Sequence, residues 1–382
     1  MEFRIGKTWW WAIALTIFMG WMVYYLQNRT VDVGCDLQAY LDGARAVEEG
    51  KSPYGPAGQS DYLYHPALAL FLDSVGATRN DPSKWWFAWL AASAFVLLAG
   101  AAALAGGVGS PWGLALFLLL FTDMVNVGID YGNIAIGVAA IVVLALLVLK
   151  RAPVAAGVLF ALAVILKTVP VVFLVYMAGR WMAGRSRRQD RICLVTAFAL
   201  LVASLLLPWM TDYVTQAGAL VEDKLGFGSN YSWAAWAYRM SGGRQILPFG
   251  LTLAAAILGA FGLGRFRRGG DKTHWAILFI LAWFASPIIW NYSNTLCFVP
   301  FAVWMDRAFD GTRSPPRPRA ARLLDILFLA IFVLSMLQMD FFWDSSLWIG
   351  RNIFPLIPMT IPLIAGCMLL LDRRVRPVDS AC

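Results

Sequence analysis

The stretch Val33-Gly34-Cys35-Asp36-Leu37-Gln38-Ala39-Tyr40 begins a polar loop, residues 28–84, in an otherwise apolar chain. The loop follows a first apolar stretch at 8–27 and includes Lys51-Ser52-Pro53-Tyr54 and Tyr64-His65-Pro66. A pore or carrier has little use for such a loop, whereas an enzyme acting on a lipid-bound substrate at a membrane surface needs one. The loop therefore determines how the remaining apolar stretches are interpreted.

The composition favours an integral membrane protein. Of the 382 residues, 60% are apolar and 14% are charged, and the mean hydropathy is +0.65. Soluble domains are about one quarter charged, and the 18 Trp and 12 Tyr are residue types that gather at membrane interfaces. The net charge of +8 fits basic cytoplasmic loops, and no basic run lies on a soluble domain, so we expect no nucleic-acid partner.

The apolar stretches predict transmembrane helices, although several are shorter than the ~20 residues that an untilted span needs. The first is preceded by Arg4 and Lys7 but is followed by no small-residue cleavage site, so we expect a retained helix. The stretches are 8–27, 85–106, 112–127, 133–149, 154–179, 192–209, 246–264, 273–289, 292–305, 323–339 and 354–371.

The basic loops set the predicted orientation. They hold most of the 31 Lys and Arg, and placing all of them in the cytoplasm satisfies the positive-inside rule. The chain between Arg151 and Arg180 must then leave and return, with Lys167-Thr168-Val169-Pro170 at the tip of a short hairpin. For the same reason, Ala67 to Ala77 is expected to be a short helix on the outer surface. The basic loops are Arg4/Lys7, Lys150/Arg151, Arg180 to Arg191, Arg265 to Lys272, Arg307 to Arg322 and Arg373 to Arg376.

The predicted fold is an all-α integral membrane bundle of about 12 spans, with both termini in the cytoplasm. We expect a single membrane domain, residues 1–382, in the plasma or inner membrane, with large extracytoplasmic loops at 28–84 and 210–245. Within the first loop, Asp36 to Glu49 predicts an amphipathic helix that ends at Gly50. Its expected apolar face is Leu37, Tyr40, Leu41, Ala44 and Val47.

Three carboxylates stand where chemistry at the outer face is possible. Asp36 follows the first span and is either a general base that takes a proton from an acceptor hydroxyl or only a helix N-cap. Asp130 lies at the outer start of the fourth span and is open to the same two interpretations. Asp123 is within the third span, where ionisable groups usually face the bundle interior.

The cations have equally open interpretations. Lys167 is the one Lys or Arg well inside an apolar stretch, and it either meets a lipid phosphate or extends to the interface. In the second large loop, Gly226 to Trp233 is followed by Arg239 and Arg244. This set suits sugar stacking and phosphate contact, and it also suits an ordinary interfacial belt.

Other site chemistry has little support. His65 and His274 do not form a metal pair, and the five cysteines have no metal-ligand spacing and imply no disulfide framework. There is no phosphate loop, no dinucleotide fingerprint and no Ser/His/Asp set. We therefore expect no metal and no cofactor.

Several stretches together resemble glycosyltransferase family 87, a group of multispanning enzymes in the GT-C superfamily. His65 departs from the family's usual Tyr-Pro-Pro, Asn133 stands where Gln is usual, and Asn291-Tyr292 follows a Trp after which relatives commonly have His. The stretches are Asp36…Tyr40…Ala44…Gly50…Pro53-Tyr54, Tyr64-His65-Pro66, Gly132-Asn133, Ala156 to Ala163 with Lys167-Thr168-Val169-Pro170, and Ser286-Pro287-Ile288-Ile289-Trp290.

The resemblance implies a GT-C-type bundle with an extracytoplasmic active site that uses a sugar carried on polyprenyl phosphate. It implies that Asp36 is the catalytic base of a direct inverting displacement. It also implies that Lys167 corresponds to the family's membrane-buried Lys, which we interpret as a contact to the donor phosphate. Arg239 and Arg244 are further candidate phosphate contacts. The candidate pocket residues are Tyr40, Tyr54, Tyr64, His65, Asp130, Asn133 and Asn291.

The function we expect is transfer of mannose from polyprenyl-phosphate mannose to a lipid-linked or cell-envelope glycan. An arabinofuranose donor is the alternative within the class. A lipid or glycolipid transporter is a second class, but it often has paired inverted halves, and here a single asymmetric hairpin is visible. A non-catalytic membrane scaffold is a third, and it should tolerate Asp36→Asn.

Overall fold

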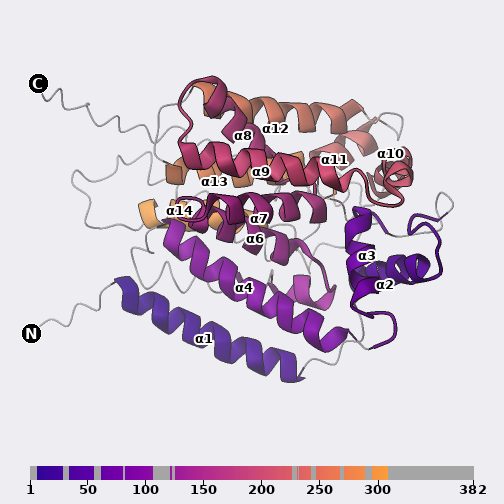
Figure 1. Cartoon of the computed structure of the whole chain (residues 1–382). Helices are drawn as coiled ribbons and strands as arrows, with labels where there is room; N and C mark the ends of the chain where they lie inside the picture. The colour runs from indigo at the N-terminus through magenta and orange to yellow at the C-terminus, as the bar shows by residue number, and fades with distance from the viewer. Residues whose placement is uncertain are drawn as a thin grey trace, which may run out of the picture.

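The computed structural model describes residues 7–28, 34–55, 62–80, 82–105, 121–122, 125–225, 230, 232–241, 247–266, 271–288 and 295–308 (Figure 1). The regular structure in this part of the chain is helical. The helices are α1 (Lys7–Asn28), α2 (Cys35–Glu48), α3 (Pro66–Ser74), α4 (Ser83–Ala105), α6 (Ala135–Val148), α7 (Pro153–Leu166), α8 (Val171–Met182), α9 (Arg188–Ser204), α10 (Met210–Leu225), α11 (Trp233–Met240), α12 (Leu247–Phe266), α13 (Asp271–Ala285) and α14 (Phe298–Ala308).

The long helices pack as a bundle with the short helices gathered at one end. Figure 1 shows α2, α3 and α10 beyond the ends of the long helices, with α11 alongside the nearby end of α12, and we call this the loop end. The turn between α8 and α9 lies at the opposite end (Figure 1). The two loops predicted to be extracytoplasmic therefore lie together, away from the arginine-rich turn between α8 and α9.

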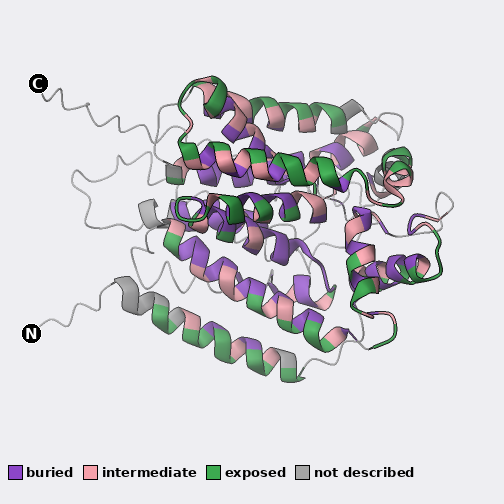
Figure 2. Cartoon of the chain, viewed as in Figure 1, coloured by how far each residue is buried: buried purple, intermediate pink, exposed green. Residues whose placement is uncertain are grey.

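Helix α6 is the centre of the bundle. Ten of its residues are buried, and it packs against α4 on one side and α7 on the other. Its sequence, Ala135-Ile136-Gly137-Val138-Ala139-Ala140, is small and apolar on every side, as expected of a helix surrounded by others. Figure 2 shows this burial along the middle of the bundle, with exposed residues on the outer helices.

The outer helices expose large apolar side chains. On α9, Phe198 is 66% exposed and Val195 is 54% exposed, and on α1 Ile17 is 59% exposed. Water would disfavour such a surface, since contiguous apolar patches on soluble monomers are small. A hydrocarbon surrounding removes that cost, so the surface suits a membrane protein.

The number of spans remains a prediction. Within the described residues, one helix, Ser83–Leu104, is long and apolar enough by length and composition to cross a membrane. Shorter apolar helices are Leu15–Tyr25, Ala135–Val148, Pro153–Leu166, Val171–Met182, Gly250–Phe266 and Lys272–Ala285. The predicted spans at 323–339 and 354–371, and most of 112–127, lie outside the described residues.

The predicted hairpin is present as α7, a four-residue turn and α8. Fourteen residues in α7 rise about 21 Å, which is less than the ~30 Å of a hydrocarbon core. The helix ends at Leu166, and Lys167 is its C-cap, with its backbone N–H bonded to the carbonyl of Ala163. The tip of the hairpin therefore presents Lys167 toward the loop end, where α7 contacts α3.

Both short helices of the first loop form where the sequence predicts them. Helix α2 buries Leu37, Tyr40, Leu41, Ala44 and Val47 and leaves Asp42, Arg45, Glu48 and Glu49 in exposed positions, so the amphipathic prediction is confirmed. Helix α3 is capped by His65 and begins at Pro66, which suits a first helical position because it has no N–H to satisfy.

Candidate functional site

The start of α2 is docked against the turn at residues 130–133. The backbone N–H groups of Asp36 and Leu37 both donate to the carbonyl of Tyr131, at 3.1 and 3.4 Å. The approach is close enough that a Cβ on Gly34 would lie 2.2 Å from the carbonyl oxygen of Asp130. Glycine at this position therefore lets two segments that are far apart in sequence meet.

The same turn needs a second glycine. Gly132 has φ +68°, a conformation that L side chains rarely adopt, and a Cβ there would lie 2.7 Å from Cβ of Leu37. Its carbonyl accepts a 2.9 Å hydrogen bond from the indole of Trp86 on α4. The turn is thus held from α2 and from α4 together.

The side chain of Asp36 faces the N-terminus of α6. Its Oδ2 accepts a 3.0 Å hydrogen bond from Nδ2 of Asn133, whose Oδ1 in turn accepts from the backbone N–H of Ala135 at 2.7 Å. The cap bond fixes which end of the buried amide is the oxygen, so the donor end must point at Asp36. The interpretation of Asp36 as the N-cap is wrong, because Gly34 occupies that position and makes no side-chain cap.

Two tyrosines line the same site. Tyr40 donates from its hydroxyl to the hydroxyl of Tyr64 at 3.1 Å, and the two rings meet edge to face with centroids 4.8 Å apart. The hydroxyl of Tyr40 also accepts from the backbone N–H of Ile134 at 3.3 Å. Burial, and next to it the charge of Asp36, raises the pKa of Tyr64, which therefore remains a neutral phenol near the carboxylate.

Lys167 completes the set with a positive charge. It lies in the turn between α7 and α8, where burial disfavours the charge of its ammonium, and the negative charge of Asp36 offsets part of that cost. The site therefore holds one acid and one cation, brought together from α2 and the α7–α8 turn.

Two further tyrosines brace the segment before α3. The hydroxyl of Tyr54 donates to the carbonyl of Tyr64 at 2.7 Å, and that of Tyr62 donates to the carbonyl of His65 at 2.8 Å. Tyr62 also accepts from the backbone N–H of Ala69 at 2.9 Å, and its ring packs on Gly43 of α2. Sequence reasoning missed Tyr62, although it stands two residues before the candidate Tyr64; its contact with Gly43 of α2 is visible only in the structure.

His65 is 7% exposed and caps α3 through Nδ1, which accepts from the backbone N–H of Ala67 at 3.2 Å. That bond leaves the ring proton on Nε2, a buried atom without a hydrogen-bond partner among the described residues. The ring meets Tyr213 of α10 edge to face at 5.7 Å, so it joins the two loops. Burial lowers the pKa of His65 to about 4, which keeps the ring neutral at physiological pH.

Asp130 lies close to the site through its backbone, but its carboxylate points elsewhere. Its Oδ1 accepts a hydrogen bond from the hydroxyl of Tyr25 on α1. This bond links the first helix to the 130–133 turn, a connection that no spacing in the sequence indicates. Asp130 therefore serves to anchor the turn that carries Asn133.

The second loop is tied to the end of α13 rather than to Asp36. Asn230 and Ser232 are fully buried, and both donate to the carbonyl of Pro287, from Nδ2 at 3.0 Å and from Oγ at 2.6 Å. Arg239 on α11 donates from Nη1 to the carbonyl of Asn230 at 3.0 Å. The amide and one guanidinium N–H of this loop are thus used in holding its own backbone.

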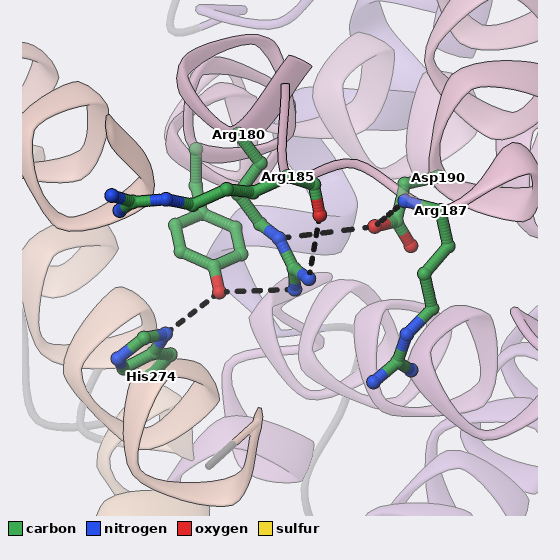
Figure 3. Close-up of polar contacts among 6 residues, drawn as sticks. Arg180, Arg185, Arg187, Asp190 and His274 are labelled. Atoms are coloured by element: carbon green, nitrogen blue, oxygen red, sulfur yellow. Dashed lines mark hydrogen bonds and ion pairs between the residues drawn. The ribbon is translucent and has the colours of Figure 1, made fainter. Parts of the chain in front are cut away.

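Three of the predicted residues are not among those that the structure describes, and a fourth lies at the other end of the bundle. Arg244, Asn291 and Asp123 lie outside the described residues. His274 is at the opposite end of the bundle from the loops, in a cluster with Arg180 (Figure 3). The described residues contain no group of three or more His, Cys, Asp or Glu that could hold a metal ion.

What the site can do follows from its charges. A carboxylate on the rigid start of a helix, oriented by a buried amide, can accept a proton from a hydroxyl group. A cation across from it can hold an anionic leaving group. The hydroxyl of Tyr64, which the buried Tyr40 holds in place, supplies a hydrogen-bonding group that suits a sugar.

The comparison with known families agrees with this arrangement. The sequence pattern of glycosyltransferase family 87 matches residues 62–287, which is more than half of the chain, so the chain belongs to glycosyltransferase family 87. The resemblance stated from the motifs is confirmed. No curated protein matches the chain.

The matched range divides the candidate residues. Tyr64, His65, Asn133, Lys167 and Arg239 lie within it, whereas Asp36, Tyr40 and Tyr54 precede it. Family membership establishes a glycosyltransferase with a sugar donor and an acceptor, and with the apolar helices it indicates a membrane protein. The roles of single residues stay predictions.

Proposed function

We propose that the chain transfers mannose from polyprenyl-phosphate mannose to a lipid-linked or cell-envelope glycan at the outer face of the plasma or inner membrane. Family membership supports sugar transfer. The loop end, with α2 and α3 beside α10 and α11, then forms the extracytoplasmic side.

One arrangement carries the proposal: the carboxylate of Asp36 is held by Asn133, and the cation Lys167 is near enough for the two charges to influence each other. A transfer from a phosphate-linked sugar needs a base for the incoming hydroxyl and a positive charge for the departing phosphate. Asp36 and Lys167 supply these two charges, and they come from separate elements that the fold brings together.

The proposed step is an inverting displacement. Asp36 removes the proton from the acceptor hydroxyl, and that oxygen forms a bond to the anomeric carbon. The bond from that carbon to the phosphate oxygen breaks, and its electron pair leaves with the polyprenyl phosphate. Lys167 stabilises the developing charge on that phosphate. The protonated Asp36 then releases its proton to water.

The remaining residues position these groups. Asn133 orients the carboxylate of Asp36, and Tyr40 with Tyr64 forms the wall beside it. Tyr54 holds the backbone of Tyr64 and so acts on the pocket indirectly. His65 and Tyr213 join the two loops at the edge of the same region.

The test is sugar transfer by the purified protein in nanodiscs, with polyprenyl-phosphate mannose and a membrane lipid extract as acceptor source. Asp36→Asn should lower the rate by about 10²–10⁴-fold, the usual contribution of a general base. The matched control is Asp42→Asn on the same helix, an exposed residue paired with Arg45, which should leave the rate unchanged.

Each result has a definite meaning. Equal rates for wild type and Asp36→Asn contradict the assignment of the base and direct attention to Asp130→Asn. Transfer with polyprenyl-phosphate arabinofuranose but not with the mannose donor contradicts the sugar and retains the mechanism. Movement of lipid across the bilayer without transfer of sugar contradicts the enzyme and favours a transporter.

A further inference from the structure

The end of the bundle opposite the loops carries a cluster of arginines that sugar transfer does not use. Arg185, Arg187, Arg188 and Arg191 are exposed, and they fall within the turn between α8 and α9 and the first turn of α9. The carboxylate of the same segment, Asp190, is buried and lies 3.9 Å from Nε of Arg180. The exposed charge of this segment is therefore entirely positive.

Hydrogen bonds hold this segment in a defined conformation. Asp190 accepts a 3.2 Å hydrogen bond from the backbone N–H of Arg187, and Arg180 donates from Nη2 to the carbonyl of Arg185 at 3.2 Å. Arg180 also donates from Nη1 to the hydroxyl of Tyr176, which bonds Nδ1 of His274 at 2.7 Å. Figure 3 shows the guanidinium of Arg180 inside this network, with the side chains of Arg185 and Arg187 directed away from it.

The end of α12 joins the same surface. A Cβ on Gly179 would lie 2.5 Å from the carbonyl of Phe261, and one on Gly264 would lie 2.3 Å from the carbonyl of Tyr176, so α8 and α12 pack backbone to backbone. Arg185 then donates to the carbonyl of Arg265 at 2.8 Å, and Arg265 donates to that of Met182 at 3.1 Å. Two elements about 80 residues apart therefore form one continuous surface.

Large apolar side chains border these arginines. Trp181 is 47% exposed, Met182 is 68% exposed and Phe266 is 71% exposed, all at the ends of α8 and α12. Arginines beside exposed aromatic side chains are the pattern found where protein meets the headgroup layer. An aqueous surrounding would favour exposure of the arginines, but it would disfavour exposure of the apolar side chains of Trp181, Met182 and Phe266.

The positive charges of these arginines also repel one another. Arg187, Arg188 and Arg191 lie three and four residues apart or adjacent, at the start of a helix whose dipole already repels cations. An anionic partner removes this repulsion. Phosphate groups also match the geometry of guanidinium donors.

We propose that this surface, Trp181, Met182, Arg185, Arg187, Arg188, Arg191, Arg265 and Phe266, binds the headgroups of anionic phospholipids in the leaflet at this end of the bundle. The aromatic and apolar side chains contact the acyl region, and the arginines contact the phosphodiesters. The lipid secures the α8–α9–α12 end of the bundle to the membrane surface. The inference does not depend on the sugar-transfer reaction.

The test uses the full chain purified in a neutral detergent. Short-chain phosphatidylglycerol or phosphatidylcholine is titrated in, and bound lipid is counted by native mass spectrometry. Wild-type protein should prefer phosphatidylglycerol. Replacing three exposed arginines with R187Q, R188Q and R191Q should weaken that binding at least tenfold, since each basic side chain near an anionic surface contributes about fivefold.

The matched control removes three exposed basic side chains at the loop end: Lys51→Gln, Arg79→Gln and Lys84→Gln. It should retain wild-type binding. Equal binding by the arginine variant and wild type, or an equal loss in the control, overturns the proposal. Helical content and the unfolding temperature establish that each variant is folded before its binding is compared.

The apolar border has its own test. Trp181→Gln with Phe266→Gln should weaken binding of the phospholipid and leave binding of inorganic phosphate unchanged. If inorganic phosphate binds wild type as tightly as the phospholipid does, the apolar side chains contribute nothing and the assignment to lipid headgroups is wrong.

Discussion

Asn133 donates a 3.0 Å hydrogen bond from Nδ2 to Oδ2 of Asp36 while its Oδ1 accepts from the backbone N–H of Ala135, the first residue of α6. One buried amide thus joins the candidate base to the start of α6. The position of Asp36 is set by α6 as much as by α2. Asn133 therefore has two roles, one in orienting Asp36 and one in holding the start of α6, and substitutions can distinguish them.

Asn133→Ser should lower the rate of sugar transfer about tenfold or more with little change in the KM for donor. Serine can still accept from the backbone N–H of Ala135 but loses the charge-assisted bond to Asp36, a bond that contributes ~1.5–3 kcal/mol. Asn133→Gln retains a donor and should recover part of the rate. Steady-state kinetics and the unfolding temperature check this. If Asn133→Ser lowers the rate and also lowers the unfolding temperature, Asn133 has a structural role only.

Lys167→Met should raise the KM for the polyprenyl-phosphate donor at least tenfold, because a phosphate loses the charge that holds it. Lys167→Arg keeps a positive charge and should raise the KM for the donor less than Lys167→Met does. The control is Lys84→Met, an exposed lysine at the start of α4. Unchanged donor saturation in Lys167→Met would remove the phosphate role from this residue.

Gly34→Ala should lower both stability and transfer rate, because its Cβ would meet the carbonyl oxygens of Asp130 and Tyr131 at 2.2 and 2.5 Å. Such overpacking costs about 1–3 kcal/mol, and it moves the start of α2 away from Asn133. Gly20→Ala on α1 has open space around the added methyl and should be neutral. Unfolding temperature and transfer rate, measured for both variants, check the contrast.

Lowering the pH from about 6.5 to 4 should reduce the unfolding temperature in detergent, in part through His65. Burial lowers its pKa to about 4, so between these values the unfolded chain binds a proton that the folded chain does not. The stabilisation is complete above the unfolded value and is lost as the pH falls toward 4. His65→Asn keeps a capping side chain at α3 and should show a shallower slope; an identical slope would exclude His65 as a source.

Orientation can be checked by labelling single cysteines in a cysteine-free background. Glu49 at the end of α2 and Arg187 in the α8–α9 turn are both exposed. An impermeant reagent applied to intact cells should label a cysteine at Glu49 and not one at Arg187. The reverse pattern would place the Asp36 site in the cytoplasm and contradict the proposed reaction there.

Local patterns were sufficient to predict the elements of the loop end. The spacing of Leu37, Tyr40, Leu41, Ala44 and Val47 predicted the buried face of α2, because a helix of period 3.6 places them on one side. Prolines and basic residues predicted the hairpin of α7 and α8. These features depend on residues close in sequence, where periodicity and turn chemistry act directly.

The contacts between elements could not be predicted in the same way. The bond from Tyr25 to Asp130 and the two bonds from Asn230 and Ser232 to Pro287 join segments more than 50 residues apart. Which polar residues face each other over such separations depends on the packing of the whole bundle. For the same reason, the cap role suggested for Asp36 was wrong: Gly34 is the N-cap of α2, and a Cβ there would lie 2.2 Å from the carbonyl oxygen of Asp130.

The docking of α2 on the 130–133 turn has a consequence for how the protein is made. Asp36 emerges from the ribosome about 100 residues before the segment that orients it, so the early chain carries this carboxylate without its hydrogen-bond partners. During that interval, the N–H groups of Asp36 and Leu37 have no carbonyl from Tyr131 to bond. Until α6 is made, the first loop is flanked by α1 and α4 and lacks the turn against which α2 docks. A nascent chain arrested before Gly128 would contain both of these helices but not the contact between Asp36 and Asn133.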